Sequence, residues 1–125
     1  MSAPAEQSTL GDGHELLYFV LSELAGQDPK AIFARLDDHL AFLSQLSKDG
    51  ILVMGGPLET EDGANSGNGI YVLRADSLAT AQQIVDRDPL HQSGIRVPRV
   101  HRWNRKKDWS TLPGRGDRPW STAAH

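Results

Sequence analysis

The chain contains no cysteine. Disulfide frameworks, thiolate zinc sites and cysteine nucleophiles are therefore excluded, and the absence fits the reducing cytoplasm in which we expect the protein to act. Long apolar stretches are also missing, since the longest, Leu16 to Leu21, has six residues, whereas a membrane-spanning helix needs roughly 18. The first dozen residues lack the basic start and the apolar middle of a secretory signal. We expect no membrane segment and no export.

Basic residues are scarce over most of the chain and concentrated at its end. Residues 1–95 contain five Lys or Arg against fourteen Asp or Glu, whereas residues 96–125 contain eight against two. A basic end on an acidic body can indicate a nucleic-acid partner. No recognisable nucleic-acid-binding motif accompanies it, and packing of the basic segment beside its own acidic body is the simpler explanation. We therefore expect no nucleic-acid partner.

The 125 residues match the size of one domain, and composition divides them into three parts. Residues 1–14 are small and polar and are expected to form a flexible leader. Residues 15–104 carry the apolar patterns of a folded domain. Residues 105–125 form a basic tail that contains Trp109 and Trp120.

The domain alternates short apolar segments with helical ones. Strands are expected at residues 15–24, 51–54, 69–74 and 95–103. One helix is expected from Asp28-Pro29 to Gly50 and another from Ser77 to Asp88-Pro89, with a loop at residues 60–68. The order β-α-β-β-α-β predicts an α+β, ferredoxin-like fold, in which a four-stranded antiparallel sheet carries two helices on one face.

The expected strands do not alternate apolar with polar residues. This holds for Leu16–Leu21, Ile51–Met54 and Ile70–Leu73. Both faces of the sheet are therefore apolar, yet the two helices cover only one of them. Because monomers rarely expose an apolar patch of that size, we predict a homodimer in which a second subunit packs on the open sheet face.

His39 is the first candidate for chemistry. It lies in the apolar stripe of the first expected helix, formed by Ile32, Leu36, Leu43 and Leu46, so its ring should point at the sheet. A buried imidazole is a natural general acid or base near neutral pH. The alternative is a core histidine whose nitrogens are satisfied by a backbone carbonyl or a carboxylate.

Asp88 is the second candidate. It extends the apolar side of the second expected helix, where a carboxylate without a partner is costly to bury. Because the two helices lie side by side in this fold, Asp88 is placed to reach His39 and to fix its tautomer. The alternative is that Asp88 only opens the Asp-Pro turn, a common position for aspartate.

Five further residues are candidates for substrate binding, each with an ordinary structural alternative. Tyr18 could donate a hydrogen bond into the site or be a core tyrosine, and Gly56 and Pro57 could line a pocket or form a turn. Arg99 and His101 could bind an anionic substrate or be solvated on an edge strand. The histidines show neither HxH nor HxxxH spacing, so we expect no metal site.

Taken together, several motifs resemble those of a known family. They are His39-Leu40, Asp49-Gly50-Ile51-Leu52, Gly55-Gly56-Pro57-Leu58, Ser77-Leu78-Ala79-Thr80-Ala81 and Asp88-Pro89-Leu90. Over roughly residues 15–104 the chain is similar to the YciI-like (YCII-related) family. The resemblance implies a ferredoxin-like dimeric α/β barrel and a histidine–aspartate acid–base pair, which falls on His39 and Asp88.

Function within that family is mostly unassigned. One branch includes a dehydrochlorinase acting on a chlorinated hydroxyhydroquinone, and the wider superfamily includes muconolactone isomerase. The resemblance implies a lyase or isomerase that needs no cofactor and acts on a small hydroxylated aromatic or lactone in catabolism. Two alternatives remain: a non-catalytic small-molecule-binding or accessory protein with a structural His–Asp pair, and an interaction module whose basic tail docks an acidic partner.

Overall fold

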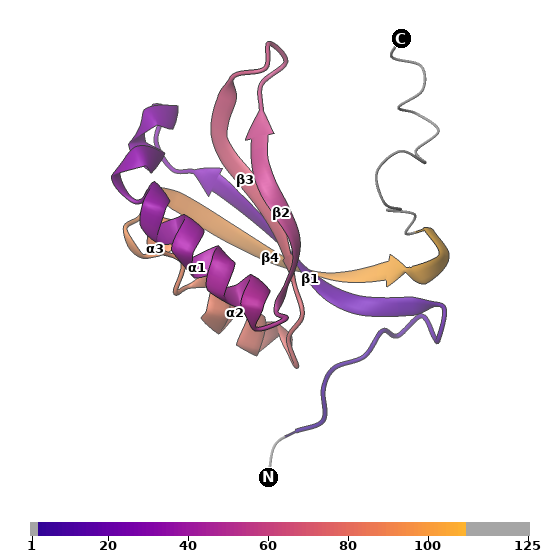
Figure 1. Ribbon diagram of the computed structural model, residues 1–125. Helices are drawn as coiled ribbons and strands as arrows, with labels where there is room; N and C mark the ends of the chain where they lie inside the picture. The colour runs from indigo at the N-terminus through magenta and orange to yellow at the C-terminus, as the bar shows by residue number, and fades with distance from the viewer. Residues whose placement is uncertain (1–2, 110–125) are drawn as a thin grey trace.

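The computed structural model of the protein describes residues 3–109, which form a four-stranded antiparallel sheet with helices gathered on one face (Figure 1). The elements in chain order are β1 (His14–Leu24), the 3₁₀ helix η1 (Pro29–Ala34), α1 (Leu36–Lys48), β2 (Leu52–Glu59), β3 (Asn65–Leu73), α2 (Leu78–Val85), α3 (Pro89–Gln92), β4 (Arg96–Lys106) and the 3₁₀ helix η2 (Lys107–Trp109). The strand order in the sheet is β2-β3-β1-β4. This arrangement confirms the expected ferredoxin-like order. None of the described helices has both the length and the apolar character needed to cross a membrane.

The first expected helix is divided in two. Asp28 caps η1, because its Oδ1 accepts a hydrogen bond from the Lys30 N–H at 3.0 Å. Arg35 then leaves the helical conformation, with φ −133° and ψ 13°, before α1 begins. Ile32 therefore lies in η1, and the buried residues of α1 itself are His39 and Leu46.

The second expected helix is divided as well, and this changes the position of Asp88. α2 ends at Val85, and Asp88 is the N-cap of the separate short helix α3. Its Oδ1 accepts a hydrogen bond from the Leu90 N–H at 2.9 Å. The break follows from Pro89, which disfavours helical geometry at the residue before it and fits the first turn of the next helix.

β2 and β3 are longer than expected. β2 continues through Gly55-Gly56-Pro57, and β3 begins at Asn65, so part of the expected loop at residues 60–68 belongs to the sheet. β2 is an edge strand, where a proline can lie without breaking the hydrogen bonding of a central ladder. Pro98 likewise lies on β4, the other edge strand.

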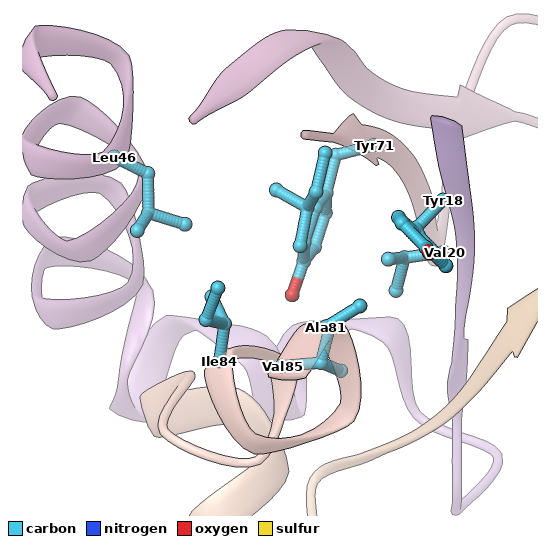
Figure 2. Packing of buried hydrophobic residues seen from close by; sticks show 8 residues of the cluster. Tyr18, Val20, Leu46, Tyr71, Ala81, Ile84 and Val85 are labelled. Carbon is cyan, nitrogen blue, oxygen red and sulfur yellow. The ribbon is translucent and has the colours of Figure 1, made fainter. Parts of the chain in front are cut away.

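The core lies between the sheet and the helices. Its buried cluster comprises Tyr18, Val20, Leu46, Tyr71, Leu73, Ala81, Ile84 and Val85. Figure 2 shows the Tyr71 ring between Leu46 on one side and Val20 on the other, with its hydroxyl directed toward the helix that carries Ile84 and Val85. The centre of β3 thereby directs a polar group toward the helical layer.

The other face of the sheet has no covering helix among the described residues. Phe19 pairs with Val72, and Leu21 pairs with Ile70, so by strand alternation these apolar side chains point away from the helices. The large side chains exposed on this face include Met54 at 40%, Val97 at 55% and Trp103 at 37%. A hollow of about 690 Å³ lies over it, and its lining includes Phe19, Met54, Ile70, Val72, His101 and Trp103.

The described part of the expected leader contacts the domain through Glu6. Its Oε1 accepts hydrogen bonds from the Tyr18 hydroxyl at 2.6 Å and from the Leu78 N–H at 3.0 Å. The same oxygen lies 3.0 Å from Nη1 of Arg102. Glu6 thus connects the leader to β1, to the start of α2 and to β4.

The start of the expected tail continues β4. Arg105 pairs across to Glu15 on β1, with 2.9 Å between Nη2 and Oε1. Trp109 in η2 is 77% exposed, and the Lys106 ammonium lies 5.4 Å from the centre of its ring. Trp120 lies outside the described residues.

Substitution of Gly55 by alanine tests the close packing of β2 on β3. An added Cβ would lie 2.6 Å from the Cβ of Tyr71 and 3.0 Å from the carbonyl oxygen of Ile70. We expect Gly55→Ala to lower the free energy of unfolding by about 1–3 kcal/mol in urea titrations. Gly13→Ala is the matched control, because nothing lies within 4 Å of its added Cβ. Equal losses in the two variants would contradict the packing.

Candidate active site

The site is built on a contact between α1 and the start of α3. Nδ1 of His39 lies 2.8 Å from Oδ1 and 2.9 Å from Oδ2 of Asp88. The His39 side chain is 8% exposed and that of Asp88 is fully buried. A carboxylate oxygen only accepts, so Nδ1 carries a hydrogen, and Nε2 is the ring nitrogen left to exchange a proton with a ligand.

The Asp88 carboxylate has two further donors. Tyr71 donates its hydroxyl to Oδ2 at 3.1 Å, and the Leu90 N–H donates to Oδ1 at 2.9 Å. Burial alone would raise the pKa of Asp88, but the hydrogen bonds from His39 and Leu90 outweigh it and hold the pKa below its usual value. Asp88 is therefore ionised at neutral pH although it is buried.

His39 opens onto a cavity of about 430 Å³ between the helical layer and the β2–β3 edge of the sheet. Its apolar lining consists of Ile32, Leu36, Leu40, Leu43, Leu52 and Ile70. The polar side chains in the wall are His39, Asn65, Tyr71 and Arg96. A small, mostly apolar pocket with a few convergent polar groups is the usual form of a small-molecule site.

A second buried histidine lies behind the pair. His91 donates from Nδ1 to the Val85 carbonyl at 2.7 Å, so its Nε2 accepts a hydrogen bond from the Ser22 hydroxyl, also at 2.7 Å. Nδ1 lies 3.9 Å from Oδ2 of Asp88, and the ring stacks on Tyr71 with 6.5 Å between centroids. Burial lowers the pKa of His91, so the ring is neutral at neutral pH.

Sequence comparison places this arrangement in a family. A profile of the YCII-related domain matches residues 17–104, a range that contains every residue of the site described above. The chain belongs to the YCII-related domain family. The expected resemblance is thereby confirmed.

Proteins similar to this YCII-related chain include a sequence relative and solved structures. The uncharacterized protein YjpA of Bacillus subtilis (strain 168) is 38% identical over 69 residues, which are 55% of this chain and 75% of that protein. The 5-chloro-2-hydroxyhydroquinone dehydrochlorinase TftG of Burkholderia phenoliruptrix AC1100, solved in complex with 2,5-dihydroxybenzoquinone, aligns with TM-score 0.59 and 22% identity over 70% of this chain and 92% of its own. The cofactor-independent oxygenase SnoaB of Streptomyces nogalater aligns with TM-score 0.45 and 14% identity over 82% of this chain and 100% of its own.

Two of the five expected substrate-binding residues lie at the cavity of this YCII-related domain. Gly56 and Pro57, on β2, form part of its wall. The same two residues also line the hollow over the open sheet face. This segment of β2 is therefore accessible from both sides of the sheet.

The structure does not bring Tyr18, Arg99 or His101 to the cavity. The Tyr18 hydroxyl is held by Glu6, and burial together with this hydrogen bond raises its pKa to about 12. Arg99 lies on β4 and pairs with Glu23, with 2.5 Å between Nη2 and Oε1. His101, opposite Phe19 on β1, lines the hollow over the open face. On an antiparallel strand, residues 99 and 101 point to the side away from the helices.

Two residues of the site were not singled out from the sequence. Tyr71 supplies a hydrogen bond to Asp88, and Arg96 reaches the cavity from the first position of β4. The alternation of Gly69, Tyr71 and Leu73 indicated that Tyr71 shares a face with Leu73, which is a signal that could have found it. Within residues 3–109, no group of three or more His, Asp or Glu side chains is placed to hold a metal ion.

The buried His91 predicts a specific pH dependence of stability. Its folded pKa lies below the ordinary 6.5, so the unfolded chain binds more protons as the pH falls through that range. Stability is therefore fully present above about pH 7 and declines as the pH falls, at up to about 1.4 kcal/mol per pH unit. Urea titrations between pH 7.5 and 5 should show a shallower decline for His91→Gln than for the wild type. The same slope in both proteins would contradict the buried neutral histidine.

Proposed function

We propose that the protein is a lyase or isomerase of small-molecule catabolism that uses His39 as its acid–base group. The proposed substrate is a small hydroxylated aromatic or a lactone, and no cofactor takes part. The observation that carries the proposal is the two-oxygen contact between buried Asp88 and His39 at the wall of a largely apolar cavity. A well-shielded imidazole whose ring is held in one orientation is suited to moving protons in such a pocket.

The proposed chemistry is a proton transfer through Nε2 of His39. The ring takes a proton from a C–H or O–H group of the substrate, and the Asp88 carboxylate stabilises the imidazolium that forms. The electron pair left on the substrate then either shifts the double bond or expels a leaving group. In an isomerisation the imidazolium returns the proton to another substrate atom, and in an elimination the proton leaves with the departing anion. A positioned base of this kind contributes about 10²–10⁴-fold to the rate.

Asp88 is a positioning residue in this scheme. Tyr71 and the Leu90 N–H fix its carboxylate, and the carboxylate in turn fixes the His39 ring. The apolar cavity wall excludes water, which strengthens the interaction between the imidazolium and the carboxylate. Tyr18, Arg99 and His101 have no part in the proposed step, because they lie outside the cavity.

The class of substrate is supported by the fold relative of known activity. TftG is a dehydrochlorinase whose structure contains a dihydroxybenzoquinone. The cavity of the present chain, at about 430 Å³, has room for a single substituted ring. A ring-derived substrate with hydroxyl groups is therefore the proposed class.

One observation favours the alternative of a non-catalytic binding protein. Asp88 caps α3 and accepts from Tyr71, so it has a structural role whether or not His39 reacts. In that alternative His39 is only the third partner of a buried carboxylate. Its loss would then lower the melting temperature without affecting any turnover.

Deuterium incorporation separates the two functions. Catechols, hydroxyquinols, chlorinated analogues and lactones are first screened for a shift in melting temperature, and the hits are incubated with the protein in D₂O. Mass spectrometry should show exchange or product formation with the wild type and a loss of at least about 10² in rate with His39→Gln. His14→Gln, at the far start of β1, is the histidine control. Hits that bind the wild type but neither exchange nor react would favour the non-catalytic alternative.

We further propose that a second copy of the chain covers the open sheet face. The uncovered face carries Phe19, Met54, Ile70, Val72 and Trp103 around one hollow. An apolar patch of this kind is typical of an interface rather than of a free surface. Apolar side chains of two such sheets would bury one another face to face.

Light scattering tests this interface. The wild type is expected to have the mass of a dimer at micromolar concentration, and Trp103→Glu is expected to reduce it to a monomer by burying a charge at the interface. Phe33→Glu is the matched control, because Phe33 is 66% exposed in η1, away from this face. A monomeric wild type, or a dimer that tolerates Trp103→Glu, would contradict the proposal.

A further inference from the structure

We infer that Arg96 gives the cavity an anion-binding end, so that the substrate carries a carboxylate in addition to its ring. This inference rests on the proposed function, because it concerns the ligand of the same cavity. It narrows the proposed substrate class to rings that carry a carboxylate.

Arg96 is buried but only partly bonded. The residue is 5% exposed, at the start of β4, and its Nε donates to the Gly67 carbonyl at 2.7 Å. Within the part of the chain that the structure describes, no carboxylate forms an ion pair with it. Arginine is almost never buried without a partner. The positive charge is therefore desolvated, and no carboxylate of the described residues is in contact with it.

Asp88 is the acidic group that acts on Arg96, but its oxygens are already engaged. The carboxylate accepts from His39, from Tyr71 and from the Leu90 N–H. Burial lowers the pKa of Arg96, and the charge of Asp88 only partly opposes this. Arginine nonetheless stays protonated in proteins. The guanidinium of Arg96 thus has its terminal nitrogens available for a ligand.

β3 is shaped to hold this guanidinium. A Cβ on Gly69 would lie 3.1 Å from Nη1 and 3.4 Å from Nη2 of Arg96, so the absence of a side chain gives the group its place beside the strand. Gly67, which supplies the carbonyl that Nε contacts, has φ +85°, a conformation that other residues rarely adopt. The two glycines and the Nε hydrogen bond fix the side chain, and they leave Nη1 and Nη2 available to bind a ligand.

Arg96 and His39 line the same cavity, and the rest of its side chains are mostly apolar. Two terminal guanidinium nitrogens match the two oxygens of a carboxylate. A ligand with its carboxylate on Arg96 and its ring against Leu36, Leu43 and Leu52 would be oriented toward His39. The fixed positive charge would also stabilise negative charge that develops on the ring when His39 removes a proton.

Two ring probes of nearly equal shape test this inference. Salicylate carries a carboxylate, and salicylamide replaces it with a neutral amide. Calorimetry on the wild type should show that salicylate binds about 10- to 100-fold more tightly than salicylamide, the range expected for a charge-assisted contact. Arg96→Gln should remove this preference by weakening salicylate alone. Arg87→Gln, which changes an exposed arginine on the outside of the helical layer, should keep it.

The comparison of the two probes on the wild type does not depend on how a variant folds. Arg96→Lys is a second variant, which keeps the charge but loses the planar pair of donors, and it should weaken salicylate binding without affecting salicylamide. Equal affinities in the wild type, or a preference that persists in Arg96→Gln, would overturn the inference. In that case, if His39→Gln weakened the binding of salicylamide, the proposed function of His39 would stand for neutral rings although the inference about Arg96 would fail. Failure of both probes to bind would overturn the ring site itself.

Discussion

The Asp88 carboxylate is fully buried, and it keeps its charge through donors from three different elements. His39 approaches from α1, Tyr71 from β3, and the Leu90 N–H belongs to α3. Removing any one donor would leave part of a buried charge without compensation, which is far more costly than the loss of a surface ion pair. The carboxylate therefore fixes the relative positions of two helices and a strand. Two of these donors, His39 and Tyr71, also line the cavity.

The break between α2 and α3 makes this arrangement possible. If α2 continued through residue 88, the backbone there would be helical and its side chain would follow the helix surface. Pro89 disfavours helical geometry at Asp88, so α2 cannot continue through it. In its N-cap conformation, with φ −61° and ψ 125°, Asp88 directs its carboxylate back over the start of α3. The two interpretations of Asp88 from the sequence, as the start of a turn and as the partner of His39, are thus both realised by the same side chain.

Much of this fold and site could be predicted from the sequence. The features that could not be predicted depend on contacts between distant segments. The helical spacing of His39 among aliphatic residues, the Asp-Pro pair and the side-by-side helices of the expected fold together predicted their contact. Arg96 gave no such signal: its burial depends on two glycines of a strand about 30 residues away, and a charged residue at a strand end is ordinarily solvated. The length of β2 was missed since Gly55-Gly56-Pro57 is typical of a turn, and only its position at a sheet edge allows it to continue as a strand.

That glycine–proline segment of β2 has a consequence for the molecule as a whole. It borders the cavity at His39 on one side of the sheet and the apolar hollow on the other. Gly56 has no side chain on either side, so at this point the two spaces share a wall that is one backbone thick. A group that packs against this wall from the hollow therefore also affects the shape of the cavity on its other side. In the proposed dimer, contacts made over the hollow would therefore act on the same strand edge that shapes the proposed ligand cavity.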